Sequence, residues 1–141
     1  MTDKNPTPTE VWHKQHEYVR NCDAEGQASL FAEDAIWDLP FAPKEVPRRL
    51  EGKAQILAMS KAGMENSKRK GNRITEYKDV VIHETTDPEV IIAEFTLVGM
   101  TAQNTTYEIP YIQVVRVCAG KILSLRDYFP GEVISNALAN K

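Results

Sequence analysis

The chain has 141 residues, of which 42% are hydrophobic and 26% are charged. These fractions are typical of a globular protein and exclude a disordered or fibrous one. The 17 basic and 20 acidic side chains give a formal net charge of -3, which favours neither nucleic acid nor an anionic membrane as a partner. The polar start is unlike a signal peptide and no stretch could span a bilayer, so we expect a cytoplasmic protein.

The first part of the sequence predicts three helices and one strand. After a polar tail over 1–7, a single domain is expected over 8–141. Thr7 or Thr9 can cap a first helix that ends near Asp23, because its apolar residues recur at helical spacing. The later elements are a short helix ending near residue 34, a strand over 35–41, a helix over 53–66 and a basic linker over 67–73.

From residue 74 the pattern changes to strands. Four apolar runs are separated by turn signals, and they cover 74–84, 89–99, 106–117 and 121–129. A short closing helix is predicted over 132–140. Helices followed by an antiparallel meander indicate an α+β fold, in which the helices cover one face of a curved sheet.

Asp127 is the residue that most directly suggests chemistry. Alternation along the last strand places Asp127 on one face with Leu123, Leu125 and Phe129. A carboxylate among apolar neighbours must be paired, protonated, or retained because it does chemistry. The structural alternative is a carboxylate held by a buried tyrosine or a backbone amide.

Glu94 and Gln113 are polar exceptions of the same kind on the two preceding strands. Glu94 shares a strand face with Thr96, and Gln113 shares one with Tyr111. If these faces line one cavity with Asp127, the pKa of one carboxyl is raised by desolvation and by the other carboxyl. The alternation leaves open which face of 89–99 meets the helices, and Glu94 pairing with Arg116 or Arg126 across an exposed face is the alternative.

Other polar residues have simpler interpretations. Asp38 falls opposite the apolar face of Trp37 and is expected to be solvated, and His83 stands alone on a strand, structural or exposed. His13 and His16 are the only pair spaced like metal ligands, but no further ligand supports a metal site. Cys22 and Cys118 are expected to be reduced.

Several segments resemble the NTF2-like superfamily, specifically its SnoaL-like branch and the phenazine-biosynthesis A and B proteins. The segments, in order, are LFAEDAIWDLPFAP, RRLEGKAQIL, VVIHETTDPEVIIAEF and YIQVVRVCAGKILSLRDYF. The resemblance implies a cone-shaped α+β barrel, in which a curved antiparallel or mixed sheet wraps around the N-terminal helices and encloses a pocket. It also implies a homodimer formed through the outer face of the sheet.

The resemblance also bears on individual positions. Asp127 falls where relatives similar to limonene epoxide hydrolase keep a catalytic aspartate, and Glu94 falls where phenazine-type relatives have a glutamate. The hydrolase family's arginine and aspartate match Glu94 and Thr96, which argues against epoxide hydrolysis. The base, tyrosine and acid of ketosteroid-isomerase-like relatives match Leu39, Tyr18 and Gln113, which argues against that isomerase mechanism.

The leading hypothesis is an acid–base enzyme that needs no cofactor and no metal and acts on a small apolar or aromatic carbonyl compound. The catalytic residues would be Asp127 and Glu94. The substrate would be bound by Tyr18, Trp37, Thr96, Tyr111, Gln113, Leu125 and Phe129. The alternatives are a non-catalytic ligand-binding or dimerisation module and, less favoured, nucleic-acid binding through the basic linker.

Overall fold

The structure is a computed structural model that describes residues 5–134. Its elements, in chain order, are α1 (Pro8–Arg20), α2 (Ala24–Ser29), β1 (Phe31–Asp38), β2 (Arg49–Glu51), α3 (Lys53–Lys70), β3 (Arg73–Glu84), β4 (Val90–Met100), β5 (Thr106–Cys118) and β6 (Lys121–Tyr128). Part of the predicted tail and most of the predicted closing helix lie outside the described residues. None of the helices described is both long and apolar enough to cross a membrane.

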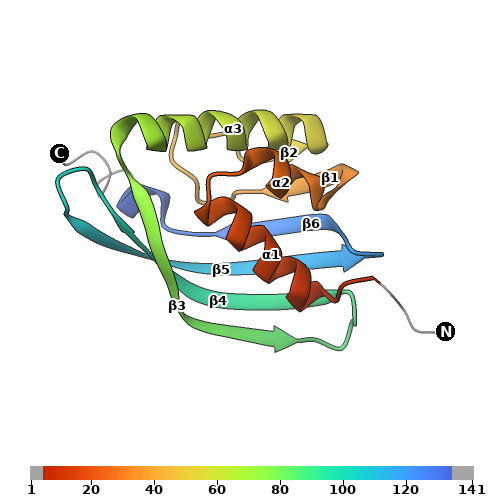
Figure 1. Ribbon diagram of the computed structural model, residues 1–141. Coiled ribbons are helices and arrows are strands. Elements are labelled where there is room, and N and C mark those ends of the chain that lie inside the picture. Colours follow the sequence, from red (N-terminus) through yellow and green to blue (C-terminus); the bar gives the residue numbers. More distant parts are fainter. Residues whose placement is uncertain (1–4, 135–141) are drawn as a thin grey trace.

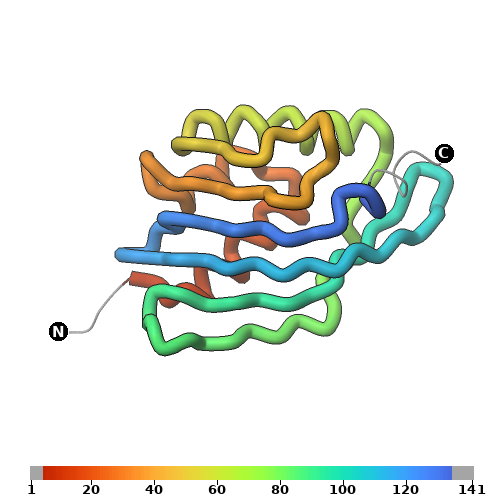
Figure 2. Tube along the Cα trace, turned by 180° about the vertical axis from the view of Figure 1, so that it is seen from behind, coloured from red at the N-terminus to blue at the C-terminus, as the bar shows by residue number. Residues whose placement is uncertain are grey.

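The six strands form one sheet in the order β2-β1-β6-β5-β4-β3. The pairs from β3 to β6 are antiparallel, which confirms the predicted meander, whereas β1 runs parallel to β6. The three helices lie on one face of this sheet (Figure 1), and the opposite face is open in the view from behind (Figure 2). The predicted α+β fold, with a curved mixed sheet around the helices, is therefore confirmed.

Local sequence signals explain where α1 begins. The Thr7 side chain accepts a hydrogen bond from the Glu10 backbone, and the Glu10 side chain accepts one from the Thr7 backbone. This reciprocal capping satisfies two amide groups that the first helical turn leaves without partners. The helix ends at Arg20, slightly before the predicted end near Asp23, because Asp23 instead caps α2 through its side chain.

Two predicted boundaries are wrong. The short helix α2 ends at Ser29, and β1 already begins at Phe31, in a segment predicted to be helical. Phe31 is buried and pairs with Ile122 of β6, so a long-range strand pairing overrides the local helical pattern.

The third helix extends through much of the predicted basic linker. α3 runs to Lys70, and its last turn carries three basic residues. Positive side chains interact favourably with the helix dipole at a C-terminus. Gly71 then stops the helix with φ 79°, a left-handed conformation that favours glycine.

A register shift in the β5–β6 hairpin changes one predicted strand face. Arg116 lies opposite Ser124, whereas Val117 lies opposite Ile122, so Leu123 is an extra residue in β6. Ile122 rather than Leu123 therefore points into the core. Leu125 and Asp127 lie beyond the shift and both face the helices, as predicted.

Candidate active site

A cavity of about 360 Å³ lies between the helices and the inner face of the sheet. Its wall includes His16 from α1, Trp37 from β1, Tyr77 from β3, Tyr111 and Gln113 from β5 and Asp127 from β6. We refer to it as the central cavity. Its volume and its mixture of aromatic and polar side chains are typical of a site for a small organic molecule.

Asp127 is the one carboxylate that lines the central cavity in the described part of the chain. Its side chain is almost wholly buried, with an exposed fraction of 4%. The Trp37 indole donates to Oδ2 at 3.2 Å, and the Gln113 amide donates to Oδ1 at 3.0 Å. Burial raises the pKa of Asp127 to about 6, against the opposing effect of the bonds from Gln113 and Trp37. Asp127 can therefore exchange a proton near neutral pH.

Gln113 connects Asp127 to α1, because its side chain is hydrogen-bonded to Asp127 and to two residues of that helix. Its Oε1 accepts from Trp12 Nε1 at 2.9 Å and lies 3.0 Å from His16 Nε2. An indole nitrogen can only donate, so Oε1 must face Trp12 and the amide nitrogen must face Asp127. The orientation of Gln113 is thus determined by Trp12.

His16 is a cavity residue that the sequence interpretation did not assign to the site. Because Oε1 of Gln113 can only accept, His16 Nε2 carries the hydrogen. Burial lowers the pKa of His16 to about 4, and the bond to Gln113 only partly opposes that effect. His16 is therefore neutral near pH 7, and its Nδ1 is an acceptor. The signal in the sequence is the spacing of Trp12 and His16, which puts both on one apolar face of α1.

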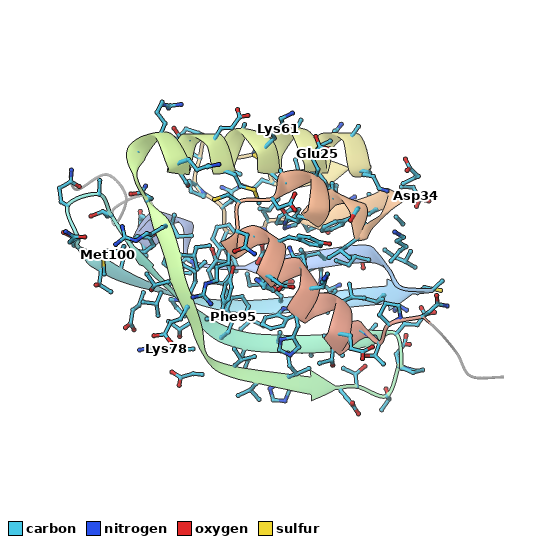
Figure 3. All side chains as sticks on the ribbon, viewed as in Figure 1. Glu25, Asp34, Lys61, Lys78, Phe95 and Met100 are labelled. Atoms are coloured by element: carbon cyan, nitrogen blue, oxygen red, sulfur yellow. The ribbon has the colours of Figure 1, made fainter. Side chains whose placement is uncertain are left out.

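Aromatic rings form much of the remaining wall around Phe95. Phe95 stacks on Tyr111 with ring centroids 5.1 Å apart, and it contacts Tyr77 and His16 edge-on. Side chains crowd the space around the labelled Phe95, near β3 and α1 (Figure 3). Burial raises the pKa of the Tyr111 hydroxyl well above its usual range, and burial also raises that of Tyr77. Both side chains therefore stay neutral phenols.

The structure brings together most of the site residues predicted around Asp127. The central cavity is lined by Asp127, Trp37, Tyr111, Gln113 and Phe129. Leu125 lies in the adjacent hydrophobic core and is not part of the wall. Leu125 therefore does not contact a ligand in the central cavity.

Glu94 and Thr96 are not brought to Asp127, so the prediction of one shared cavity is wrong for both. Ala93 and Phe95 face the core, and the alternation over this part of β4 sends Glu94 and Thr96 to the other side of the strand. Both border a second hollow, which Tyr111 and Phe129 also line but Asp127 does not. The Glu94 side chain is 52% exposed and accepts a bond from His83 Nε2 at 2.6 Å. Arg116, one partner considered for Glu94, instead pairs with Asp87 and Glu89.

Tyr18 is also placed away from the central cavity. Its ring covers Gly26 of α2 so closely that a side chain at Gly26 would collide with it. The Lys14 ammonium group lies over the same ring, 5.4 Å from its centroid. The packing of α1 on α2 therefore accounts for Tyr18, and the prediction that it binds the substrate is not supported by its position.

The remaining polar residues match the simpler interpretations in part. Asp38 lies on the face opposite the core, but it is ion-paired to Arg49 at 2.7 Å. Cys22 and Cys118 are both free thiols. Within residues 5–134 no group of three or more His, Cys, Asp or Glu side chains could hold a metal ion.

Comparison with known proteins shows the family of the chain. Residues 12–125 match the SnoaL-like domain, and the chain belongs to this family. An uncharacterised PhzA/B-like protein of Pseudomonas aeruginosa is 31% identical over 79% of this chain and 75% of that protein. The uncharacterised Bacillus subtilis protein YesE is 28% identical over 91% of this chain and 84% of its own.

Solved structures agree with this assignment. A candidate isomerase from Bacillus subtilis has a TM-score of 0.82 and 27% identity, and the alignment covers 95% of this chain and 94% of the isomerase chain. A candidate polyketide cyclase from Pseudomonas putida has a TM-score of 0.66 and 26% identity, and covers 88% and 92%. An NTF2-like protein from Burkholderia xenovorans shares the fold at 18% identity, with a TM-score of 0.66 and coverage of 94% and 97%.

Proposed function

We propose that this protein is an acid–base enzyme that acts on a small, largely apolar or aromatic carbonyl compound. The observation that carries the proposal is the buried Asp127 carboxylate on the wall of the central cavity, with a pKa raised to about 6. A general base is most effective when its pKa lies near the working pH. Asp127 is then mostly ionised near pH 7 and still basic enough to accept a proton.

The proposed step is removal of a proton from a carbon next to the carbonyl group. The C–H bond breaks, an O–H bond forms on Asp127, and the electron pair moves to the carbonyl oxygen as an enolate. If the enolate is conjugated with a C=C bond, Asp127 returns the proton to the far carbon of that system, which gives isomerisation. If the enolate instead attacks a second carbonyl carbon of the same molecule, a ring closes and the new alkoxide takes the proton back from Asp127. Neither outcome needs an oxidant or a reductant, so the proposal includes no cofactor.

The other residues in the cavity have defined roles in this proposal. Gln113 and Trp37 are positioning residues, because each donates to one oxygen of Asp127 and leaves its remaining lone pairs for the substrate. Tyr111, a neutral phenol on the same wall, would donate to the developing enolate oxygen. Phe129 packs on Tyr111 at 5.2 Å and limits the movement of its ring. Glu94 has no part in this step.

The relatives support the proposal by their names. Two of the similar structures are named as a candidate isomerase and a candidate polyketide cyclase. Isomerisation and ring closure are the two outcomes that one proton abstraction by Asp127 can produce. These names do not identify the substrate of this chain, so the experiment that tests the proposed function must not depend on a known product.

Solvent exchange tests the proposal without an identified product. The probe is 2-tetralone, an aromatic ketone with acidic hydrogens next to its carbonyl group, dissolved in D2O and followed by proton NMR. We expect the protein to accelerate the exchange of these hydrogens above the buffer rate. Asp127→Asn should abolish the acceleration, and Glu94→Gln, a matched change on the outer face, should retain it.

Two results would contradict this function. Exchange that is equally fast with Asp127→Asn would remove Asp127 from the chemistry. Binding of 2-tetralone, seen as thermal stabilisation, without any exchange would favour the non-catalytic ligand-binding module. That alternative is consistent with the two hydrogen bonds that Asp127 accepts, since a purely structural carboxylate would be held in the same way.

We further propose that the protein forms a homodimer through the outer face of the sheet. Phe41, Val81 and Ile112 are large apolar residues with exposed fractions of 63%, 48% and 45%. Phe41 and Ile112 also border a shallow hollow that includes Tyr128. Light scattering during gel filtration should give a dimer for the wild type and a monomer for Ile112→Glu.

A further inference from the structure

Three buried side-chain atoms in the described part of the chain lack a hydrogen-bond partner. They are His16 Nδ1, Gln27 Oε1 and the Tyr77 hydroxyl. All three residues line the central cavity. Buried polar groups in folded proteins are nearly always hydrogen-bonded, and an unpaired one is costly. Their grouping around one cavity indicates a ligand that completes these bonds.

The hydrogen-bonding role of His16 Nδ1 is defined by its neighbours. Trp12 orients the Gln113 amide, and Gln113 in turn requires a hydrogen on His16 Nε2. The imidazole is neutral, so Nδ1 presents a lone pair and can only accept. A ligand that pairs with it must supply an O–H or N–H group.

The other polar atoms on the wall favour the same kind of ligand. Gln27 Oε1 is an acceptor, and ionised Asp127 is another. The Tyr77 hydroxyl can accept or donate, so it can bond to a group that is itself a donor to His16. A hydroxyl group has this double capacity, whereas an ammonium group can only donate.

Charge near Tyr77 also favours a neutral hydroxyl over an ammonium group. Arg20 lines the cavity and donates to the backbone oxygen of Thr75 at 2.5 Å, two residues from Tyr77 along β3. Within residues 5–134 Arg20 forms no ion pair with a carboxylate. An ammonium group placed beside Tyr77 would face this positive charge.

We propose that the central cavity selects a hydroxyl-bearing aromatic compound, whose hydroxyl group donates to His16 Nδ1 and bonds to the Tyr77 hydroxyl. The His16 and Tyr77 rings lie 4.8 Å apart, edge to face, and both contact Phe95. Gln113 is hydrogen-bonded both to His16 and to Asp127. The inference rests on the proposed function in taking the same cavity as the substrate site, and it adds the substrate class.

A pair of probes that differ in one hydrogen-bond donor tests the inference. 2-Naphthol has the hydroxyl group, and 2-methoxynaphthalene has the same rings with no donor. We expect the wild type to bind the naphthol about tenfold more tightly, the effect of one good hydrogen bond. The imidazole ¹⁵N signal of His16 Nδ1 should shift with the naphthol and stay unchanged with the ether.

Two variants test whether His16 and Tyr77 are the residues that recognise the hydroxyl group. His16→Phe keeps an aromatic ring beside Phe95, and Tyr77→Phe removes only the unpartnered hydroxyl group. His16→Phe should lose the preference for the naphthol, and Tyr77→Phe should weaken the binding of the naphthol. Tyr77→Phe should also unfold at the same or a higher temperature than the wild type without ligand, because a buried unpaired group is removed. Tyr18→Phe, a matched change outside the cavity, should keep the preference.

The outcomes separate this inference from the proposed function. If both probes bind equally and perturb the Asp127 and Trp37 signals, the inference is wrong while the cavity is still a ligand site. If the preference persists in His16→Phe, or if Tyr77→Phe binds the naphthol as tightly as the wild type, the inference is also wrong. Failure of both probes to bind would overturn the inference and the ligand site together, and loss of solvent exchange alone would overturn only the catalytic proposal.

Discussion

Gln113 and Asp127 are register partners on the neighbouring strands β5 and β6, and the amide of Gln113 donates to Asp127 Oδ1 at 3.0 Å. The pairing of the two strands therefore fixes the carboxylate next to its main hydrogen-bond donor. Because Trp12 orients the same amide from α1, the position of Asp127 depends on the docking of that helix. The geometry of the site and the packing of the fold are determined by the same contacts.

The first prediction concerns Trp37. The bond from its indole to Asp127 Oδ2 lowers the pKa of that carboxyl, although burial has the larger and opposite effect. Trp37→Phe keeps a ring and removes the donor, so the Asp127 pKa should rise from about 6 to roughly 7. Carboxyl-detected NMR titration measures this value. An unchanged or lower pKa would show that the bond does not stabilise the carboxylate.

The sequence was sufficient to predict that Asp127 and Gln113 point to the inner face, because side chains alternate regularly over the parts of β5 and β6 that contain them. The register shift in β6 falls before Leu125, so it moves Leu123 and leaves Asp127 on the predicted face. The fold was predictable for a similar reason, since four long strands and capped helices carry strong local patterns.

Glu94 and His16 show what the sequence could not resolve. The faces of β4 each contain enough apolar residues to be buried, and only the packing of Phe95 against α1 decides between them. His16 was noted only for its spacing from His13, because a lone histidine on an apolar helix face has no partner visible in the sequence. Its partner, Gln113, is 97 residues away.

The second prediction is a compensation between two buried groups in the pH dependence of stability. Asp127 has a folded pKa of about 6, above its ordinary 3.8, so its contribution to stability is present below about pH 4 and is lost as pH rises to about 6. His16 has a folded pKa of about 4, below its ordinary 6.5, so its contribution is lost as pH falls from about 6.5 to 4. Each effect is about 3 kcal/mol, and they oppose each other.

Single variants should reveal these opposing effects. The unfolding free energy of Asp127→Asn should rise with pH from about 4 to 6.5 more steeply than that of the wild type, because only the His16 effect is left. That of His16→Phe should fall over about pH 4 to 6 relative to the wild type. Urea unfolding at several pH values measures both slopes. If the unfolding free energies of the variants change with pH in parallel with that of the wild type, the claim that burial disfavours the charged forms of Asp127 and His16 is wrong.

The third prediction tests the placement of Glu94 and His83. Their bond of 2.6 Å lies on the outer face, with both side chains about half exposed. Exposed ion pairs contribute only about 0.2–1 kcal/mol, so Glu94→Gln and His83→Gln should each change the unfolding free energy by no more than that. The Asp127 pKa should be unaffected in both. A changed Asp127 pKa in Glu94→Gln would show that Glu94 interacts with Asp127 and would contradict its placement outside the site.

The fourth prediction concerns the contact between Tyr18 and Gly26. Alanine is normally favoured over glycine within a helix, but a methyl group at Gly26 would collide with the Tyr18 ring and the Asp23 carboxylate. Gly26→Ala should therefore destabilise the protein by about 1–3 kcal/mol. Tyr18→Ala in the same chain should recover part of that loss, as a double-mutant cycle would show. A stabilising Gly26→Ala would contradict the packing described for Tyr18.

The most direct test of the central claim is the pKa of Asp127, measured by carboxyl-detected NMR titration and assigned by the signal that Asp127→Asn removes. The account predicts a value of about 6, which should coincide with the midpoint of the pH profile for 2-tetralone exchange. A value at or below about 4, the ordinary range of an aspartate, would mean that the carboxylate is solvated or ion-paired and would contradict its role as the general base.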